Sequence, residues 1–405
     1  MSASSVPFRR RSRRLAPAAL ASASLFLLAA CGGGSISEGG GGGDGGESDG
    51  PVKIGLSVPL SGVYAALGED MTQGFELYLD ENDGQLGGRD IELVTADEGE
   101  SPQTGVPATT KLVTQNGVSA VVGIVNSATA LGLKDTFVQS EVPLIIANAG
   151  ADELTDDASP YIWRTSFTNG QVGAALGAAV AEELGDEEVF LMAADYAAGH
   201  ESVDGFREAF TEAGGSIAGE TFTPFGTTSD WQPFLSRVRS SGAGAVYVFY
   251  AGAEAVNFVK QYDSFGISDN AQLYGAGFLT EGGVLDAQGA AATGVRTSLH
   301  YSHLLESERN TEFVEAYQAA YDEVPTVYAV QAYDAAAALD AALEDAESTD
   351  GAGVAEALAN VGEIDSPRGT WSFDEDHNPD QPYYLREVQE VDGGLANAVL
   401  EELEQ

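Results

Sequence analysis

Short apolar runs alternate with amphipathic stretches along the chain from Val52 to about residue 300. The runs Ala120–Val125 and Val142–Ala147 are rich in β-branched residues, and an Asn follows each of them, whereas Pro59 follows the strand-like run Lys53–Val58. Between such runs, stretches like Glu69–Asn82 place their large apolar residues on one helical face. Strands that alternate in this way with helices indicate an α/β fold, with parallel sheets covered by helices.

About nine strand-like runs precede residue 300, which favours two sheets over one. Three helical patterns follow, at 309–321, 328–347 and 352–360. Two further strand-like pieces, Thr370–Phe373 and Tyr383–Val391, lie near the C-terminus.

The stretch from Val118 to Gly150 shows the alternation most clearly, because a helical segment at Ala130–Ser140 lies between two strand-like runs. In parallel sheets ligands bind beyond the carboxyl ends of the strands. Ser127 would lie at the first turn of the helix, where free N–H groups and the helix dipole favour an anion such as a carboxylate. The alternative is that Ser127 only caps the helix.

The first 50 residues have a different composition. A run of arginines ends at Arg14, and the apolar segment Leu15–Ala30 is shorter than the roughly 20 residues that span a bilayer. The sequence Leu28–Gly32 resembles a bacterial lipobox, in which Cys31, the only cysteine, would be lipid-modified. We predict a signal peptide at 1–30 and a lipidated Cys31 followed by a Gly-rich flexible linker to residue 50. The protein would then be exported and anchored to the outer face of the cell membrane, or be periplasmic.

Charge excludes some partners. The chain has 63 acidic and 18 basic residues, and five of the basic residues precede Leu15, where no acid occurs. The remaining chain is therefore strongly acidic and would repel nucleic acid. A single cysteine also excludes an intramolecular disulfide.

Several segments together resemble the type I periplasmic binding proteins, in the leucine/isoleucine/valine-binding branch. In chain order they read KIGLSVPLSGVYAALGED, GGRDIEL, VVGIVNSATA, VPLIIANAGADELT, YIWRTSFTN, YAAGHESVDGFREAF, FVKQYDSFG and VYAVQAYDAAAAL. The resemblance covers about residues 52–390. It implies two Rossmann-like, doubly wound lobes that close over a ligand by a hinge.

The resemblance also implies the domain limits. One lobe would comprise 52–168 and about 301–368, and the other 169–300 and about 369–395. The crossings between them would lie near Phe167–Asn169, Thr297–Tyr301 and Pro367–Thr370. The implied function is that of a non-enzymatic, extracytoplasmic binding protein without a cofactor. We expect a monomer that delivers a small solute to the membrane permease subunits of an ABC importer.

Carried over by position, the site keeps only part of the family pattern. Ser127 matches the family serine that binds the ligand carboxylate. Gly150 replaces the family threonine, and Gly277 or Phe278 replaces the acid that pairs with the ligand ammonium. The tyrosines that wall the family pocket match Leu67, Ala198 and Ala253. The predicted solute contacts are Tyr64, Leu67, Asn126, Ser127, Asn148, Ala149, Gly150, Tyr196, His200, Tyr250, Glu254, Gly277 and Phe278.

Two kinds of solute remain open. Without the family acid, a buried ammonium would lose its water and gain no counter-charge, which favours a carboxylate that lacks the α-amine. The small residues that replace tyrosines would leave room for an aromatic body, and the Asn148–Gly150 loop resembles members of the branch that bind aromatic acids. A branched-chain amino acid stays possible if Glu254 or Glu281 supplies a relocated partner.

Other chemistry finds less support. The histidines His200, His300, His303 and His377 have no zinc-ligand spacing with a cysteine. The acidic stretch Asp374–Asp380 lacks the glycine and the distal glutamate of an EF-hand and favours a hairpin turn. A sensor domain of the same fold would need an output segment, and a secreted enzyme would need a nucleophile–base set. We expect no enzyme, because Asp195, His200 and Ser202 lack a nucleophile elbow. We expect no sensor either, because we find no output segment in the sequence. Arg164 is interpreted as structural.

Overall fold

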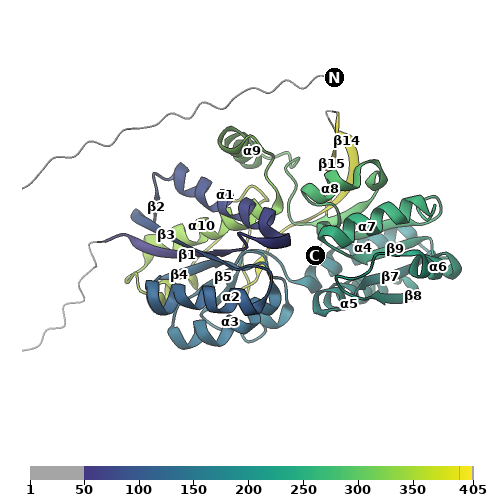
Figure 1. Cartoon of the computed structure of the whole chain (residues 1–405). Helices are drawn as coiled ribbons and strands as arrows, with labels where there is room; N and C mark the ends of the chain where they lie inside the picture. The colour runs from purple at the N-terminus through teal and green to yellow at the C-terminus, as the bar shows by residue number, and fades with distance from the viewer. Residues whose placement is uncertain (1–49, 392, 404–405) are drawn as a thin grey trace, which may run out of the picture. The chain divides into compact units, whose positions relative to one another are not determined.

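Two mostly parallel sheets organise the chain, as the alternation of strands and helices predicts. The computed structural model describes residues 50–391 and 393–403, so the predicted signal peptide and Cys31 lie outside the described residues. Figure 1 shows that each sheet has helices on both faces. We call the two sheets with their helices the N-lobe and the C-lobe.

The N-lobe sheet has the strand order β2-β3-β1-β4-β5-β6, with only β2 antiparallel to its neighbour. Its strands are β1 (Val52–Val58), β2 (Gln85–Leu86), β3 (Arg89–Asp97), β4 (Ala120–Gly123), β5 (Leu144–Ile146) and β6 (Ile162–Arg164). Its helices are α1 (Ala65–Glu81), α2 (Pro102–Lys111), α3 (Ser127–Ser140), α9 (Glu308–Tyr321), α10 (Val327–Asp345) and α11 (Gly351–Leu358). Helices α1 and α10 cover one face of this sheet, and α2 and α3 cover the other (Figure 1).

The C-lobe sheet has the order β15-β14-β11-β10-β9-β7-β8, in which β14 and β15 form an antiparallel pair at one edge. Its strands are β7 (Glu188–Ala194), β8 (Ser216–Thr223), β9 (Ala245–Phe249), β10 (Gln272–Ala276), β11 (Arg296–Leu299), β14 (Tyr383–Val391) and β15 (Gly394–Leu403). Its helices are α4 (Asn169–Leu184), α5 (Ala197–Glu212), α6 (Gln232–Ser241), α7 (Gly252–Ser264) and α8 (Gly283–Gln288).

Strand β7 shows why its residues form a strand with two buried faces. Val189, Leu191 and Ala193 belong to one apolar cluster with α4 and α5, whereas Phe190 and Met192 belong to a second cluster with α6 and α7. Alternate residues of a strand point to opposite faces, so an uninterrupted apolar run fits a sheet that is covered on both sides.

Three segments connect the lobes, and the first overlaps the crossing that we expected near Phe167–Asn169. Residues 165–168 lead from β6 to α4. The second segment, 300–307, begins three residues later than predicted, because 297–299 still belong to β11.

The prediction for the third crossing, Pro367–Thr370, is wrong. Residues 372–380 form a small hairpin of β12 (Ser372–Phe373) and β13 (Pro379–Asp380) that packs on β6 of the N-lobe. The Arg164 amide donates to the His377 carbonyl at 3.0 Å, and the His377 ring stacks on Trp163 with centroids 3.7 Å apart. The chain therefore crosses at 381–382, and the C-lobe segment extends through β15 to Leu403 rather than ending near 395.

Within these described residues, none of the helices combines the length and the apolar character needed to span a membrane.

Candidate functional site

A cavity of about 380 Å³ lies where the strand order reverses in both lobes. In the N-lobe this is the boundary between β1 and β4, and in the C-lobe it is the region around β7 and β9. Open α/β sheets bind ligands beyond the carboxyl ends of strands at such points. Eight of the predicted contacts line this cavity: Tyr64, Leu67, Asn126, Ser127, Asn148, Gly150, Tyr196 and Phe278.

The α3 terminus forms the polar end of the cavity. The N-cap of α3 is Asn126, whose side chain accepts from the Thr129 amide at 3.0 Å, so Ser127 is not the cap. The Ser127 hydroxyl accepts from the Ala151 amide at 3.2 Å, which leaves its own proton for a ligand. Among the described residues, no hydrogen bond engages the amides of Ser127 and Ala128. Free N–H groups at a helix start, together with this hydroxyl, suit a carboxylate.

A buried carboxylate holds the loop before α3. Glu98 is fully buried, and its two oxygens accept the Val125 and Asn126 amides at 2.8 Å each. Burial raises the pKa of Glu98 to about 7, although the two amide hydrogen bonds oppose that shift. The preceding Ile124 has a φ of 66°, which is a strained conformation for a β-branched residue. The loop geometry is thus set by contacts to Glu98 rather than by local preference.

Gly150 has no room for a side chain. A Cβ atom at this position would lie 2.4 Å from Cε2 of Phe167 and 2.5 Å from Oδ1 of Asn169. The Phe167 ring therefore occupies the space that a threonine would need. The Asn169 amide also donates to the Gly150 carbonyl at 2.8 Å, which fixes this loop against the first residue of α4.

Aromatic rings form most of the remaining wall. The seven aromatic lining residues are Tyr64, Phe167, Tyr196, Phe225, Phe249, Phe278 and Tyr328. Phe278 lies 4.7 Å from Phe167 and 6.4 Å from Tyr328 between ring centroids, so rings from both lobes and from the first crossing meet here. No Asp, Glu, Lys, Arg or His is among the described residues that line the cavity. The site can therefore surround an apolar body with rings and hold one anionic group at the α3 end.

Five predicted contacts do not line the cavity. Ala149 is buried behind the loop, and Tyr250 is buried in the C-lobe, where its hydroxyl lies 3.3 Å from that of Thr223. His200 pairs with Asp195 at 2.8 Å and stacks on Phe222. The remaining two are Glu254 and Gly277.

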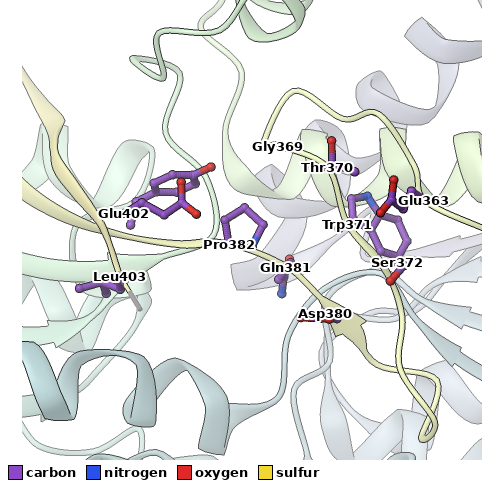
Figure 2. Close-up of a pocket in the computed structure, with 11 residues that line it drawn as sticks. Glu363, Gly369, Thr370, Trp371, Ser372, Asp380, Gln381, Pro382, Glu402 and Leu403 are labelled. Atoms are coloured by element: carbon purple, nitrogen blue, oxygen red, sulfur yellow. The ribbon is translucent and has the colours of Figure 1, made fainter. Parts of the chain in front are cut away.

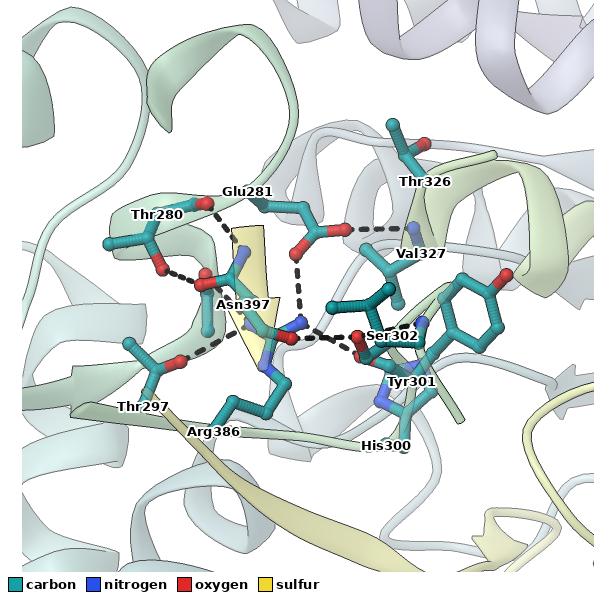
Figure 3. A network of polar contacts seen from close by, with 12 residues as sticks. Thr280, Glu281, Thr297, His300, Tyr301, Ser302, Thr326, Val327, Arg386 and Asn397 are labelled. Atoms are coloured by element: carbon teal, nitrogen blue, oxygen red, sulfur yellow. Dashed lines mark hydrogen bonds and ion pairs between the residues drawn. The ribbon is translucent and has the colours of Figure 1, made fainter. Parts of the chain in front are cut away.

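Both proposed ammonium partners are engaged elsewhere. Glu254 accepts the Gly226 amide at 2.9 Å, and Ala253 beside it does not line the cavity either. Glu281 lies 3.0 Å from Nη1 of Arg386 and accepts the Val327 amide at 3.0 Å, as Figure 3 shows. Neither carboxylate lines the cavity.

Gly277 faces the same arginine. Its carbonyl accepts from Nη2 of Arg386 at 3.3 Å, and a Cβ atom on Gly277 would lie 2.5 Å from that nitrogen. The family acid therefore could not be restored at this position without displacing Arg386.

Four of the aromatic rings and one amide were not predicted from the sequence. These residues are Phe167, Phe225, Phe249, Tyr328 and Asn169. Phe225 and Phe249 lie at or just beyond the carboxyl ends of β8 and β9, so the strand-end rule contained a signal for them. Tyr328 stands at the start of a helix from the other end of the chain, and nothing in the sequence alone indicated it.

A second cavity, of about 490 Å³, follows the third crossing and contains none of the predicted contacts. Figure 2 shows Glu363, Asp380 and Glu402 around Pro382 and Trp371. Among the residues described, no three His, Cys, Asp or Glu side chains are placed to hold a metal ion. The Asp374–Asp380 stretch comprises the turn of the β12–β13 hairpin followed by β13 itself, and in the turn Asp374 accepts the Asn378 amide.

The nucleophile set is also dispersed. Ser202 is buried and bonds to the Tyr247 hydroxyl at 2.7 Å, whereas Asp195 and His200 pair with each other.

Known proteins that resemble this chain in sequence and in structure are solute-binding proteins of one family. A family model described as periplasmic binding protein matches residues 51–394. Leu/Ile/Val-binding protein homolog 6 of Brucella melitensis biotype 1 is 32% identical over 350 residues, which cover 85% of this chain and 89% of that protein. An ABC transporter substrate-binding protein from Sphaerobacter thermophilus has a TM-score of 0.82 and 35% identity, over 87% of this chain and 98% of its own.

A solute-binding protein of an ABC transporter from R. palustris, solved in complex with benzoate, has a TM-score of 0.77 and 37% identity, with coverage of 87% and 98%. These matches and the two sheets confirm the predicted two-lobe fold. The chain therefore belongs to the periplasmic binding protein family, with the Leu/Ile/Val-binding homologues and the substrate-binding proteins of ABC transporters among its relatives.

Proposed function

We propose that the protein is the extracytoplasmic solute-binding component of an ABC importer and captures a small aromatic carboxylate of the benzoate kind. The observation that carries the proposal is the composition of the cavity wall, which combines seven aromatic rings with no acidic side chain among the described residues. Its volume of about 380 Å³ is in the range of small-molecule sites, roughly 300–1,000 Å³. The relative that was solved with benzoate supports the same class of solute.

A branched-chain amino acid is the second candidate, since a curated relative carries the name Leu/Ile/Val-binding protein homolog. It would bring an ammonium into a cavity that neither candidate acid, Glu254 or Glu281, lines. Burying an ammonium without a counter-charge costs several kcal/mol. This cost disfavours the amino acid.

Calorimetric titration with benzoate, 4-hydroxybenzoate, leucine and isoleucine tests the proposal. We expect at least one benzoate to bind, and leucine and isoleucine to bind at least about 100-fold more weakly, because the missing counter-charge is worth several kcal/mol. Ser127→Ala should weaken benzoate binding roughly 10- to 100-fold by removing a charge-assisted hydrogen bond. Ser236→Ala, on the exposed face of α6, is the matched control and should leave binding unchanged. Leucine binding that is tighter than that of either benzoate would refute the proposed solute class.

Anchoring by lipid is the second part of the proposal. The basic stretch, the apolar run and the lipobox-like Leu28–Gly32 support attachment through Cys31. Acyl chains contribute about 0.8 kcal/mol per buried methylene, so several chains hold a protein on a membrane that it would otherwise leave.

Cys31→Ser should therefore move the protein from the membrane fraction to the soluble fraction of fractionated cells. Ser37→Ala in the same linker provides a control for the substitution itself. If Cys31→Ser stays on the membrane to the same extent as the unmodified chain, the lipid does not anchor the protein.

A further inference from the structure

Three arginines are fully buried within the described residues, and they differ in their counter-charges. Nε of Arg368 lies 2.7 Å from a carboxylate oxygen of Asp334, and Nη1 of Arg386 lies 3.0 Å from one of Glu281. Arg164, the last residue of β6, has no carboxylate oxygen within 4.0 Å in the described part of the chain. An isolated buried charge is costly, so the position of Arg164 calls for an explanation.

Arg164 is surrounded by oxygens of the loop that lines the cavity. Its Nη1 donates to the carbonyls of Ala149 at 2.9 Å and Phe167 at 2.8 Å. Its Nη2 donates to the Ala151 carbonyl at 2.7 Å and lies 3.3 Å from the Thr155 hydroxyl. The guanidinium thus joins the polar loop of the N-lobe to the first crossing.

These contacts set the direction of the Gly150 amide. In a trans peptide the C=O of one residue and the N–H of the next point in opposite directions. Because the Ala149 carbonyl points at Arg164, the Gly150 N–H points away from it, and Gly150 lines the cavity. No residue in the described ranges accepts a hydrogen bond from this amide. Gly150 is therefore a free donor on the opposite side of the loop from a buried positive charge.

The nearest acids do not neutralise Arg164 by contact. Asp152 accepts the Gly170 amide at 3.2 Å and Glu201 accepts from the Asn169 side chain at 2.8 Å, so each has another partner. Burial lowers the pKa of Arg164 to about 10, and these acids oppose that shift only from a distance. The guanidinium remains charged at neutral pH and donates to carbonyls of the loop.

We propose that Arg164 is a positioning and charge-selecting residue for the carboxylate of the bound solute. It turns the Gly150 amide toward the cavity, where this amide and Ser127 bind the anion together. The positive charge of Arg164 attracts the same anion from the other side of the loop backbone. Arg164 does not touch the solute. The inference rests on the proposed function, because it requires an anionic solute.

The test compares benzoate with benzamide, which has the same ring and no charge. Dissociation constants of both are measured by calorimetry for the unmodified chain, Arg164→Gln and Arg164→Lys. Arg164→Gln should lower the preference for benzoate over benzamide at least about tenfold, because the charge behind the loop is lost. Arg164→Lys keeps the charge but not the forked donor, so both ligands should bind more weakly while their ratio stays within about threefold.

Arg368→Gln is the matched control, since it removes an equally buried guanidinium that has its own carboxylate. In the control, we expect the binding of benzoate and of benzamide to weaken by the same factor. Arg164→Gln would behave in the same way if the loss of a buried arginine had only a structural effect. An unchanged benzoate-to-benzamide ratio in Arg164→Gln overturns the inference and leaves the proposed function standing. Failure of the unmodified chain to bind any aromatic carboxylate overturns the proposed function and the inference with it.

A measurement on the unmodified chain covers the case in which Arg164→Gln does not fold. In nuclear magnetic resonance spectra of labelled protein, benzoate should shift the Gly150 amide proton downfield and slow its exchange, and benzamide should do so less. A Gly150 amide that keeps its shift and exchange rate on saturation with benzoate overturns the inference.

Discussion

Gly150→Thr is expected to weaken benzoate binding by about 100-fold or more while the protein remains folded. The new Cβ would lie 2.4 Å from the Phe167 ring and 2.5 Å from Oδ1 of Asn169, and neither atom can stay where it is. Overpacking of this kind costs about 1–3 kcal/mol and occasionally more, and here the displaced groups are themselves walls of the cavity. Calorimetry with benzoate measures the loss.

Gly150→Ala should give an intermediate loss, since it adds the clashing Cβ without the rest of the threonine side chain. Gly362→Thr is the control, because Gly362 is exposed, has no positive φ, and a Cβ atom added there would meet no other atom within 4 Å. If Gly150→Thr binds benzoate as tightly as the unmodified chain, Phe167 and Asn169 do not define this end of the cavity.

Asp334→Asn is expected to have the largest effect on stability, lowering the free energy of unfolding by about 3–5 kcal/mol. Asp334 and Arg368 are fully buried, with 2.7 Å between Oδ2 and Nε, and the Ser366 hydroxyl donates to the same oxygen at 2.9 Å. Removing the carboxylate leaves the Arg368 guanidinium in the interior without its counter-charge. Urea unfolding followed by circular dichroism measures the change.

The surface pair of Lys53 and Glu92 provides the comparison. Its charged atoms are 3.8 Å apart and the side chains are 40% and 50% exposed, so Glu92→Gln should cost less than about 1 kcal/mol. The double variant Asp334→Leu with Arg368→Met should recover much of the loss, because a packed apolar pair needs no counter-charge. If Asp334→Asn and Glu92→Gln lower the free energy of unfolding equally, burial does not increase the contribution of the Asp334–Arg368 pair to stability.

The local pattern of the sequence was sufficient for the elements and for one end of the site. A run such as Ala120–Val125, followed by Asn126 and Ser127, specifies a buried strand and a helix start by its composition alone. The small shift, with the strand ending at Gly123 and the helix starting at Ser127, reflects the strained turn at Ile124, which Glu98 holds from the end of β3. The resemblance to the family, rather than composition, implied that Gly277 or Phe278 stands where the family has an acid.

From the sequence we missed β15 and misplaced the third crossing, because neither has a strong local pattern. β15 (Gly394–Leu403) contains Glu401 and Glu402, which are poor strand formers, and it is a strand because it pairs with β14. The third crossing shifted for the same reason, since residues 372–380 are held on β6 by Trp163 and His377, more than 200 positions apart in the chain.

The sequence alone determined the alternation of strands and helices and the helix start at Ser127, because both depend on residues that are neighbours in the chain. The tertiary structure decided which side chains share the cavity. It brought Phe167, Phe249 and Tyr328 together from three separate segments, and it engaged Glu254 and Glu281 with other donors. Such contacts depend on how distant elements pack, and only the packed chain fixes the distances that decide whether a ring or a charge faces the solute.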